Sequence, residues 1–265
     1  MANEDLLFSK DNGIAIVTLN RPEKLNAITH PMLQRLHTII EEIKKDDGIR
    51  VVILTGNGRA FCAGTDITDS VPLTAEVEIR AMKEKKSTEY RESHWVFNTI
   101  PKPVICAING AAVGIGAEFT LHCDIRIASE NARWGQVFVL RGMVPDTGAG
   151  TYLLPRIVGL SKACELVFSG EIIDAREMLR LGLVEKVVPE DQLMLAAVEM
   201  AKKLMRGSPL AVQMCKQLMY LGLERTIEAH QEATRYCFQL SNKTEDFKEG
   251  IQSFFEKRAP RWIGK

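Results

Sequence analysis

A carboxylate follows a glycine-rich stretch at residues 110–124, which read GAAVGIGAEFTLHCD. Glu118 comes four residues after Gly114 and directly before Phe119, so we expect its side chain in an apolar environment. A lone buried charge is costly without a purpose, and burial raises a carboxyl pKa toward neutrality, where the group can exchange protons. The alternative is a glutamate that only favours the positive end of a helix dipole, a gain of about 0.3–1 kcal/mol.

A second glycine-rich turn, GRAFCAGTDI at residues 58–67, follows another apolar run. Its small side chains leave backbone N–H groups accessible, and such groups can hold an oxygen that gains negative charge. The alternative is a tight turn that needs glycine only for its backbone angles. Neither turn has the G-x-G-x-x-G spacing of a dinucleotide site. Together they predict that one N–H from each meets a single carbonyl oxygen, as a thioester undergoing enolisation would need.

A second candidate carboxylate, Asp146, lies in RGMVPDTGAGTYLLPRIVG at residues 141–159. It can take part in proton exchange, or it can be the N-cap of the helix predicted after it, because aspartate is a favoured N-cap. His122 is four residues from Glu118, and we expect a hydrogen-bonded core residue there in preference to a catalytic base. The six cysteines show no metal-ligand spacing, which argues against zinc and a disulfide framework, and we expect them reduced and mostly buried.

The elements that position these residues alternate between strand and helix. Apolar or β-branched runs predict strands, and helical spacing predicts a helix at 31–47 and another from Gly116. A polar helical stretch is expected at about 72–98. This alternation is typical of an α/β fold with a largely parallel sheet, whose sites lie at the carboxyl ends of the strands. The predicted strands cover residues 13–22, 49–58, 102–110 and 124–129.

From about residue 160 the pattern changes to successive amphipathic helices, among which only EKVVP predicts a strand. We divide the chain into a core at 1–200 that holds the site and a helical region at 201–265 for oligomerisation and covering the site. The 265 residues carry 34 basic and 34 acidic side chains, which gives no electrostatic footprint for nucleic acid or anionic lipid. No targeting pattern or membrane span is recognisable, and we expect a cytoplasmic protein.

Six segments, in order along the chain, resemble the crotonase superfamily, the enoyl-CoA hydratase/isomerase fold, and the match covers essentially the entire chain. The resemblance implies an α/β, crotonase-like (ββα)n spiral core with a helical C-terminal trimerisation region. It implies homotrimers or hexamers built as dimers of trimers. It implies no metal and no separate cofactor, since coenzyme A is part of the substrate. The segments are NRPEKLNAI, FCAGTDI, KPVICAINGAAVGIGAEFTLHCDIRIAS, ARWGQ, DTGAGTYLLPRIVG and FFEKRAPRW.

The resemblance also assigns residues. The two oxyanion-binding amides fall on Thr65 and Ile115, with Gly64 and Gly114 shaping the turns, and the first catalytic carboxylate falls on Glu118. A larger set is expected to bind the substrate or its coenzyme A: Lys24, Leu25, Ala27, Ala60, Ala63, Gly64, Asp66, Ile67, Gly114, Phe138 and Lys257.

One departure from the family pattern affects the expected reaction. Hydratases of the family carry a second carboxylate in a Gly-Gln-Pro-Glu segment, and the matching segment here ends in Phe138, which cannot relay a proton. Asp146 lies eight residues later, where several members have an acid. These members are dienoyl-CoA isomerases, 1,4-dihydroxynaphthoyl-CoA synthases and the ring-opening isomerases of phenylacetyl-CoA breakdown.

The resemblance therefore implies an acyl-CoA-processing enzyme, an enoyl-CoA hydratase or isomerase, in which Glu118 and Asp146 act as acid and base on a thioester enolate. The sequence leaves hydration and isomerisation equally open. One alternative is a member that hydrolyses or cleaves a C–C bond in a cyclic or β-dicarbonyl acyl-CoA. Another is a non-catalytic member that binds acyl-CoA or RNA, although the zero net charge weakens the RNA version.

Overall fold

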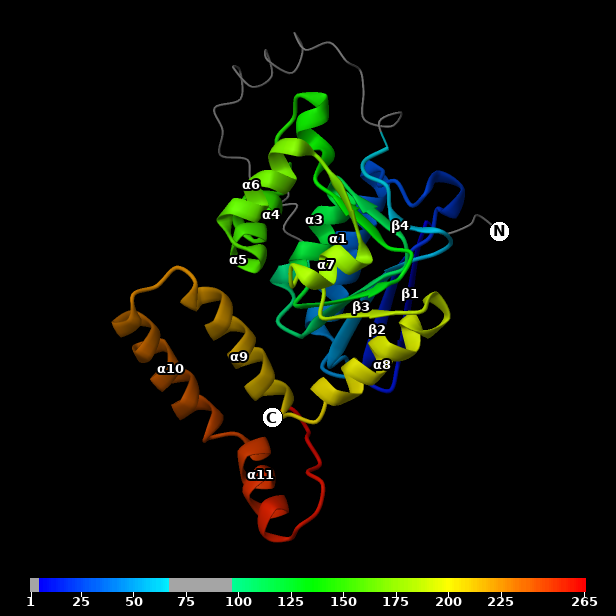
Figure 1. Cartoon of the computed structure of the whole chain (residues 1–265). Coiled ribbons are helices and arrows are strands. Elements are labelled where there is room, and N and C mark those ends of the chain that lie inside the picture. The colour runs from blue at the N-terminus through cyan, green and yellow to red at the C-terminus, as the bar shows by residue number, and fades with distance from the viewer. Residues whose placement is uncertain (1–4, 67–96) are drawn as a thin grey trace, which may run out of the picture.

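Two β-sheets form the core of the protein, in a computed structural model that describes residues 5–66 and 97–265 (Figure 1). The larger sheet has the strand order β1-β2-β3-β5-β7-β10 and is parallel except for the antiparallel pair β1–β2. Its strands are Leu6–Asp11, Ile14–Leu19, Val51–Gly56, Val104–Ile108, Ile125–Ser129 and Lys186–Val188. The smaller sheet has the order β4-β6-β8-β9, with strands Ala60–Cys62, Ala111–Val113, Arg133–Gly135 and Ile172–Asp174.

The central strands of the larger sheet are buried on both faces, which explains their continuous apolar runs. Along β3, Val52 and Leu54 pack into one hydrophobic cluster, while Val51 and Ile53 pack into a second cluster on the other face. This alternation follows from the two-residue side-chain period of a strand. The first cluster includes α1 and α3, and the second includes α8, so the sheet lies between helices.

Helix α1 illustrates how the sequence determines where a helix begins and which face it buries. Thr29 caps α1 by accepting a hydrogen bond from the Met32 amide, and its buried residues recur at helical spacing, from Met32 to Ile43. The α-helices are α1 His30–Lys45, α3 Ile115–His122, α4 Ala149–Tyr152, α5 Leu154–Val158, α6 Leu160–Ser169, α7 Ala175–Arg180, α8 Leu193–Leu204, α9 Pro209–Gly222, α10 Ile227–Ser241 and α11 Glu245–Phe255. Short 3₁₀ turns are η1 Pro22–Lys24, η2 Phe97–Thr99, η3 Val137–Arg141 and η4 Glu190–Gln192.

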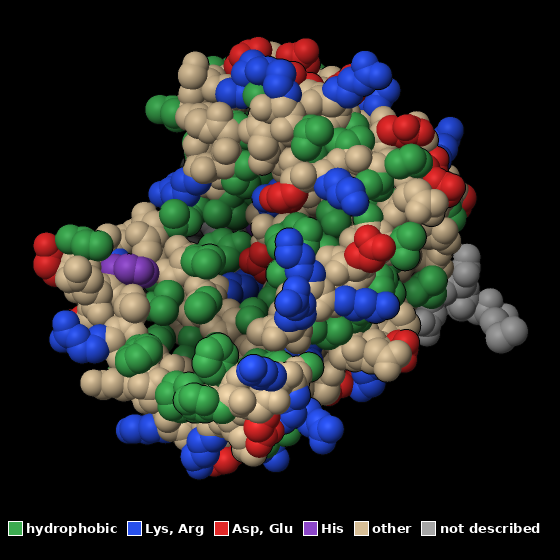
Figure 2. Space-filling view, turned by 60° about the horizontal axis from the view of Figure 1, so that its bottom comes forward, with side chains coloured by type: hydrophobic (Ala, Val, Ile, Leu, Met, Phe, Trp, Pro, Cys, Tyr) green, Lys and Arg blue, Asp and Glu red, His purple; other side chains and the backbone are tan. Residues whose placement is uncertain are grey.

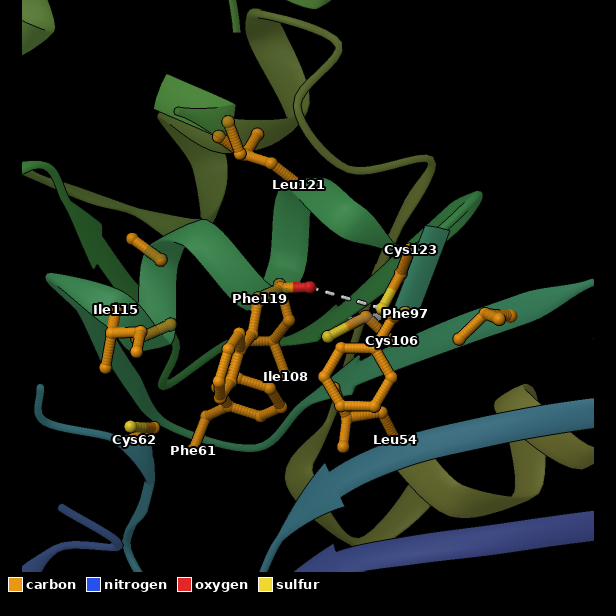
Figure 3. Close-up of a cluster of buried hydrophobic side chains, with 14 of the residues drawn as sticks. Leu54, Phe61, Cys62, Phe97, Cys106, Ile108, Ile115, Phe119, Leu121 and Cys123 are labelled. Atoms are coloured by element: carbon orange, nitrogen blue, oxygen red, sulfur yellow. Dashed lines mark hydrogen bonds between the residues drawn. The ribbon is translucent and has the colours of Figure 1, made fainter. Parts of the chain in front are cut away.

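Helix α3 carries the glycine-rich motif and is buried along its whole length. Figure 3 shows Phe119 pointing from α3 into a cluster that contains Phe61 and Phe97. The rings of Phe97 and Phe119 meet edge to face, with centroids 5.4 Å apart. This packing fixes the helix on the sheet and therefore fixes the position of Glu118, one residue earlier.

The C-terminal helices α9–α11 extend away from the sheets (Figure 1). Helix α9 is held to the core where Lys216 and Tyr220 both contact the Asp124 carboxylate, at 2.7 and 2.8 Å. Neither α9 nor α10 contains a buried residue. Phe254 and Phe255 of α11 are each 77% exposed. Figure 2, in which the bottom of Figure 1 comes forward, shows hydrophobic side chains gathered around a hollow on this side.

Comparison with the sequence predictions confirms the α/β core, the four predicted strands and the helical C-terminal region. The expectation of a single strand among the C-terminal helices is wrong, because β9 precedes β10 there. Each of the strands of the smaller sheet has only three residues, which is too short for a periodicity to be read. The helical stretch expected at 72–98 falls outside the described residues, except for the part of η2 at residues 97–98. Of the six cysteines, Cys215 is exposed and three are buried.

Candidate active site

The two glycine-rich turns lie against each other. They follow β4 and β6, which are parallel neighbours in the smaller sheet, so both turns leave the same edge. A Cβ atom added to Gly114 would lie 3.7 Å from the Cα atom of Gly64. Both glycines have positive φ angles, 125° at Gly64 and 58° at Gly114, which side chains rarely permit. Glycine therefore supplies the backbone conformation of both turns, while the distance between them is an ordinary van der Waals contact.

The residues after these glycines are the predicted oxyanion donors. Ile115 is the first residue of α3, where backbone N–H groups have no acceptor within the helix. Thr65 follows Gly64 and is bridged to Ile28 in parallel, through bonds that use the Gly64 carbonyl and the Asp66 amide. Among hydrogen bonds between described residues, none is donated by the amide of Thr65 or of Ile115. The described part of the chain thus supplies no hydrogen-bond acceptor to either N–H group.

Glu118 lies in the first turn of α3 and is completely buried. Its Oε1 atom accepts a hydrogen bond from Gln136 Nε2 at 2.6 Å, and its Oε2 atom accepts one from Thr147 Oγ1 at 2.5 Å. A Cβ atom at Gly150 would lie 2.6 Å from Oε1, so only glycine leaves room for the carboxyl group there. Three segments, β8 to η3, the loop before α4, and α4 itself, thus hold this carboxyl group in place.

The surroundings of Glu118 change its affinity for a proton. Burial raises the pKa of the Glu118 carboxyl above its ordinary value, because the low-dielectric interior disfavours the charged form. Hydrogen bonds from Thr147, Gln136 and the Gly150 backbone oppose this rise, while the negative charge of Asp146 adds to it. The net effect is a raised pKa, as a group that takes up and releases protons near neutral pH requires.

Asp146 lies in an exposed position directly before Thr147. The N-cap alternative for this residue is wrong, because Gly148 is the N-cap of α4 and no side chain caps that helix. Asp146 is close enough to Glu118 for its charge to raise the pKa of the Glu118 carboxyl. Of the two carboxylates that the sequence singled out, one is therefore buried and the other is exposed.

Phe138 lies beside the glycine turns. It belongs to η3 and is only 7% exposed, and its Cζ atom would lie 3.9 Å from a Cβ atom on Gly114. An aromatic ring therefore lies next to the turns, at the position to which the resemblance assigns a second carboxylate in hydratases. The ring gives this wall no group that can transfer a proton.

Most of the residues predicted to bind coenzyme A lie in two neighbouring backbone segments. The Ala63 amide donates to the Leu25 carbonyl at 3.0 Å, so Lys24, Leu25 and Ala27 lie beside Ala60, Ala63 and Asp66. The Asp66 carboxylate is paired with Arg21 at 3.1 Å. Ile67 lies outside the described residues. Lys257 lies two residues after the end of α11, which is far from α3 in Figure 1.

Sequence reasoning did not find the residues that hold Glu118. Gln136, Thr147 and Gly150 each contact its carboxyl group, yet none of them was singled out. Gln136 belongs to the segment ARWGQ, and Thr147 follows Asp146 in the segment DTGAGTYLLPRIVG. Both residues therefore lie in segments that resemble the family. A hydrogen bond between side chains 18 or 29 residues apart has no signature in sequence spacing.

Metal-binding clusters and membrane-spanning helices are both absent from the residues that the structure describes. Among residues 5–66 and 97–265, no group of three or more His, Cys, Asp or Glu side chains is arranged to hold a metal ion. Within the same ranges, no helix has the length and hydrophobicity needed to cross a bilayer.

Comparison with known proteins identifies the class to which this fold and site belong. The sequence profile of the enoyl-CoA hydratase/isomerase family matches residues 9–265. The chain belongs to this family of enzymes, which confirms the predicted crotonase superfamily and fold.

Individual relatives align along almost the whole chain. A short-chain-enoyl-CoA hydratase of Clostridium acetobutylicum is 39% identical, with 97% of each chain covered. A 1,2-epoxyphenylacetyl-CoA isomerase of Escherichia coli is 34% identical, with 99% of each covered. The crystal structure of an enoyl-CoA hydratase from Bacillus anthracis superposes with a TM-score of 0.90 at 34% identity, covering 99% of this chain and 100% of the other.

Proposed function

We propose that the chain moves a double bond within an enoyl-CoA thioester by transferring a proton between two carbon atoms. The observation that carries this proposal is the buried Glu118 carboxyl, held by two donors beside the contact between Gly64 and Gly114. Proton removal next to a thioester places negative charge on the carbonyl oxygen. The amides of Thr65 and Ile115 are the donors proposed to stabilise that oxygen.

In the proposed reaction the substrate loses one proton at C2 and gains one at C4. The Glu118 carboxylate takes a proton from C2 of a 3-enoyl thioester, and the C–H electron pair forms the enolate. The electrons then return to form the C2–C3 double bond while C4 receives a proton from Asp146 in its acid form. The cycle closes when Glu118 releases its proton and Asp146 takes up another, which the exposed Asp146 can obtain from solvent.

Hydration of a 2-enoyl thioester is the second candidate, because relatives of this chain are hydratases. In that case Glu118 or Asp146 directs water to C3 and the other supplies the proton at C2. The aromatic wall at Phe138 favours isomerisation, since isomerisation needs no bound water and no carboxylate at that position.

A direct test follows both reactions in one preparation. The protein is incubated with crotonyl-CoA and, separately, with a 3-enoyl-CoA, and water addition is compared with double-bond migration by chromatography. Migration faster than hydration supports the proposal, and hydration alone supports the second candidate. Turnover of neither substrate, together with cleavage of a β-dicarbonyl acyl-CoA, would overturn both.

The C-terminal helices form a further part of the proposal. Large apolar side chains such as Tyr236 and Phe238 are each 63% exposed, which is unusual for the outer surface of a monomer. We propose that residues 201–265 join copies of the chain into a homotrimer or a dimer of trimers. Light scattering on the purified protein tests this, and a monomeric mass at micromolar concentration would contradict it.

A further inference from the structure

The hydroxyl group of Thr147 lies at the centre of a buried hydrogen-bond chain. Its Oγ1 atom is 2.5 Å from Glu118 Oε2, 3.3 Å from His122 Nε2 and 3.2 Å from the Ala149 amide nitrogen. Both Glu118 and His122 are fully buried. A threonine hydroxyl has one proton to donate and two lone pairs, so its three neighbours determine how it is used.

The directions of these bonds follow from the chemistry of each partner. The Ala149 N–H can only donate, and an ionised Glu118 can only accept. The hydroxyl proton therefore points to Glu118, and one lone pair accepts from Ala149. The second lone pair faces Nε2 of His122, which completes the chain when that nitrogen carries a proton. When Glu118 is protonated, the bonds can reverse, so that the carboxyl donates to Thr147 and the hydroxyl donates to an unprotonated Nε2.

We infer that His122 is a positioning residue that sets the proton affinity of Glu118 through the hydroxyl of Thr147. The inference deepens the proposed function, because it rests on Glu118 as the group that takes the proton. In this arrangement, the presence of a proton on Nε2 of His122 and the protonation of Glu118 are linked. The reason is that the Thr147 hydroxyl can donate to only one of the two groups at a time. Thr147 joins the two, and it also anchors the loop that carries Asp146.

Other groups near Glu118 also affect its carboxyl, and they remain unchanged in variants of Thr147 and His122. Asp146, in the loop before α4, is the charged group that acts on the carboxyl, and its effect raises the pKa of Glu118. From β8 to η3 the neutral amide of Gln136 donates, and from α4 the Gly150 amide donates. At the C-terminal end of α3, Arg126 donates to the carbonyl groups of Thr120 and Cys123.

The alternative is that His122 only fills space beside Phe119, whose ring centroid is 6.2 Å from that of His122. A packing role would leave the titration of Glu118 unchanged when the ring is replaced by an apolar side chain of similar size. A positioning role would shift that titration, and the shift would need the Thr147 hydroxyl.

The experiment measures the two groups directly in the free protein. The side-chain carboxyl of Glu118 is followed by ¹³C NMR and the ring nitrogens of His122 by ¹⁵N NMR over a pH series, in the wild type and in Thr147→Val, Thr147→Ser and His122→Met. We expect the His122 signals of the wild type to change at the pH where Glu118 titrates. The valine variant should lose this common transition, and the serine variant should keep it.

The same variants carry a kinetic readout. Loss of a hydrogen bond to a charged group should lower kcat/KM on the acidic limb of the pH profile about ten-fold in Thr147→Val. In His122→Met the loss should be smaller, about three-fold, and in the same direction. Thr151→Val is the matched control, because Thr151 is exposed and donates only to the Gly148 carbonyl. Its profile should equal that of the wild type.

The inference is overturned if the His122 signals stay constant through the titration of Glu118, or if His122→Met leaves the Glu118 titration unchanged. If His122→Met fails to fold, the wild-type titration and the comparison of Thr147→Val with Thr147→Ser still test the inference. Because the NMR titrations need no substrate, coupled signals without any thioester turnover would refute only the proposed function. Turnover with uncoupled signals would refute only the inference.

Discussion

Glu118 and Asp146 belong to regions of the molecule with opposite physical character. Helix α3 is buried throughout, and the carboxyl of Glu118 receives two hydrogen bonds from fixed side chains. The loop before α4 is largely open, with Met143 50% and Val144 76% exposed and Asp146 itself exposed. In the proposed function, the buried carboxyl is the proton acceptor with a raised pKa, and the exposed carboxyl exchanges protons with solvent.

Removal of the buried carboxyl of Glu118 should have the greatest effect on activity. Glu118→Gln removes the proposed base while keeping its size, so kcat should fall about 10³- to 10⁴-fold. Turnover of the 3-enoyl and 2-enoyl thioesters by stopped-flow absorbance measures the loss. The control is Glu130→Gln, since Glu130 is exposed. A loss of less than ten-fold would show that the buried carboxyl does not take the proton.

Removal of the exposed carboxylate should have a smaller effect. Asp146→Asn takes away a group that can be reached by water, and solvent can partly replace it, so we expect a loss in kcat of about 10²-fold. The same absorbance assay applies. If Asp146→Asn proved as damaging as Glu118→Gln, the division of roles between the buried and the exposed carboxylate would be wrong.

The pH dependence of activity reports on both carboxylates, because the charge of Asp146 raises the pKa of Glu118. The raised pKa of Glu118 means that the base is still protonated, and therefore inactive, at pH values where an ordinary glutamate is ionised. The acidic limb of kcat/KM should thus lie above about pH 4.3. Asp146→Asn removes a negative charge that raises this pKa, so its limb should move to lower pH. A limb that moves to higher pH would contradict the proposed interaction.

The smallest effect concerns stability. In the folded protein Glu118 keeps its proton to a higher pH than in the unfolded chain, so the free energy of unfolding falls as pH rises from about 4.3 through the raised pKa. A glutamine has no proton to lose. Glu118→Gln should therefore be more stable than the wild type at pH 8 by about 0.5–2 kcal/mol, a difference that vanishes toward pH 4.

Urea titrations at both pH values measure this difference. Asp146→Asn, at an exposed position, should stay within about 0.5 kcal/mol of the wild type at either pH. A glutamine variant that is less stable at pH 8 would mean that the hydrogen bonds of the Glu118 carboxylate outweigh the cost of burying its charge.

Much of the architecture was predictable, because long periodic segments determine their own structure. The run at residues 49–58 is apolar because β3 is buried on both faces, and the spacing at residues 31–47 places one face of α1 against the sheet. The smaller sheet escaped prediction. Its strands have three residues each, and they depend on pairing between segments far apart in the chain.

The site was predictable to the level of motifs but not of contacts. Glycine marked both turns because positive φ angles exclude most side chains, and Glu118 was evident from its apolar neighbours. The partners of its carboxyl were not evident, since Gln136 and Thr147 reach it only through the fold. The N-cap alternative for Asp146 was wrong because the helix begins two residues later than the aspartate would require.

The proposed function requires the two glycine turns to hold one thioester oxygen between their amides. Isotope-edited infrared spectroscopy tests this on Glu118→Gln, in which we expect turnover slow enough to observe the bound thioester, with an enoyl-CoA labelled with ¹³C at the thioester carbonyl. Two N–H donors polarise that bond, so we expect a C=O stretch at lower frequency than for the same thioester in water. A frequency equal to or above the value in water would contradict it.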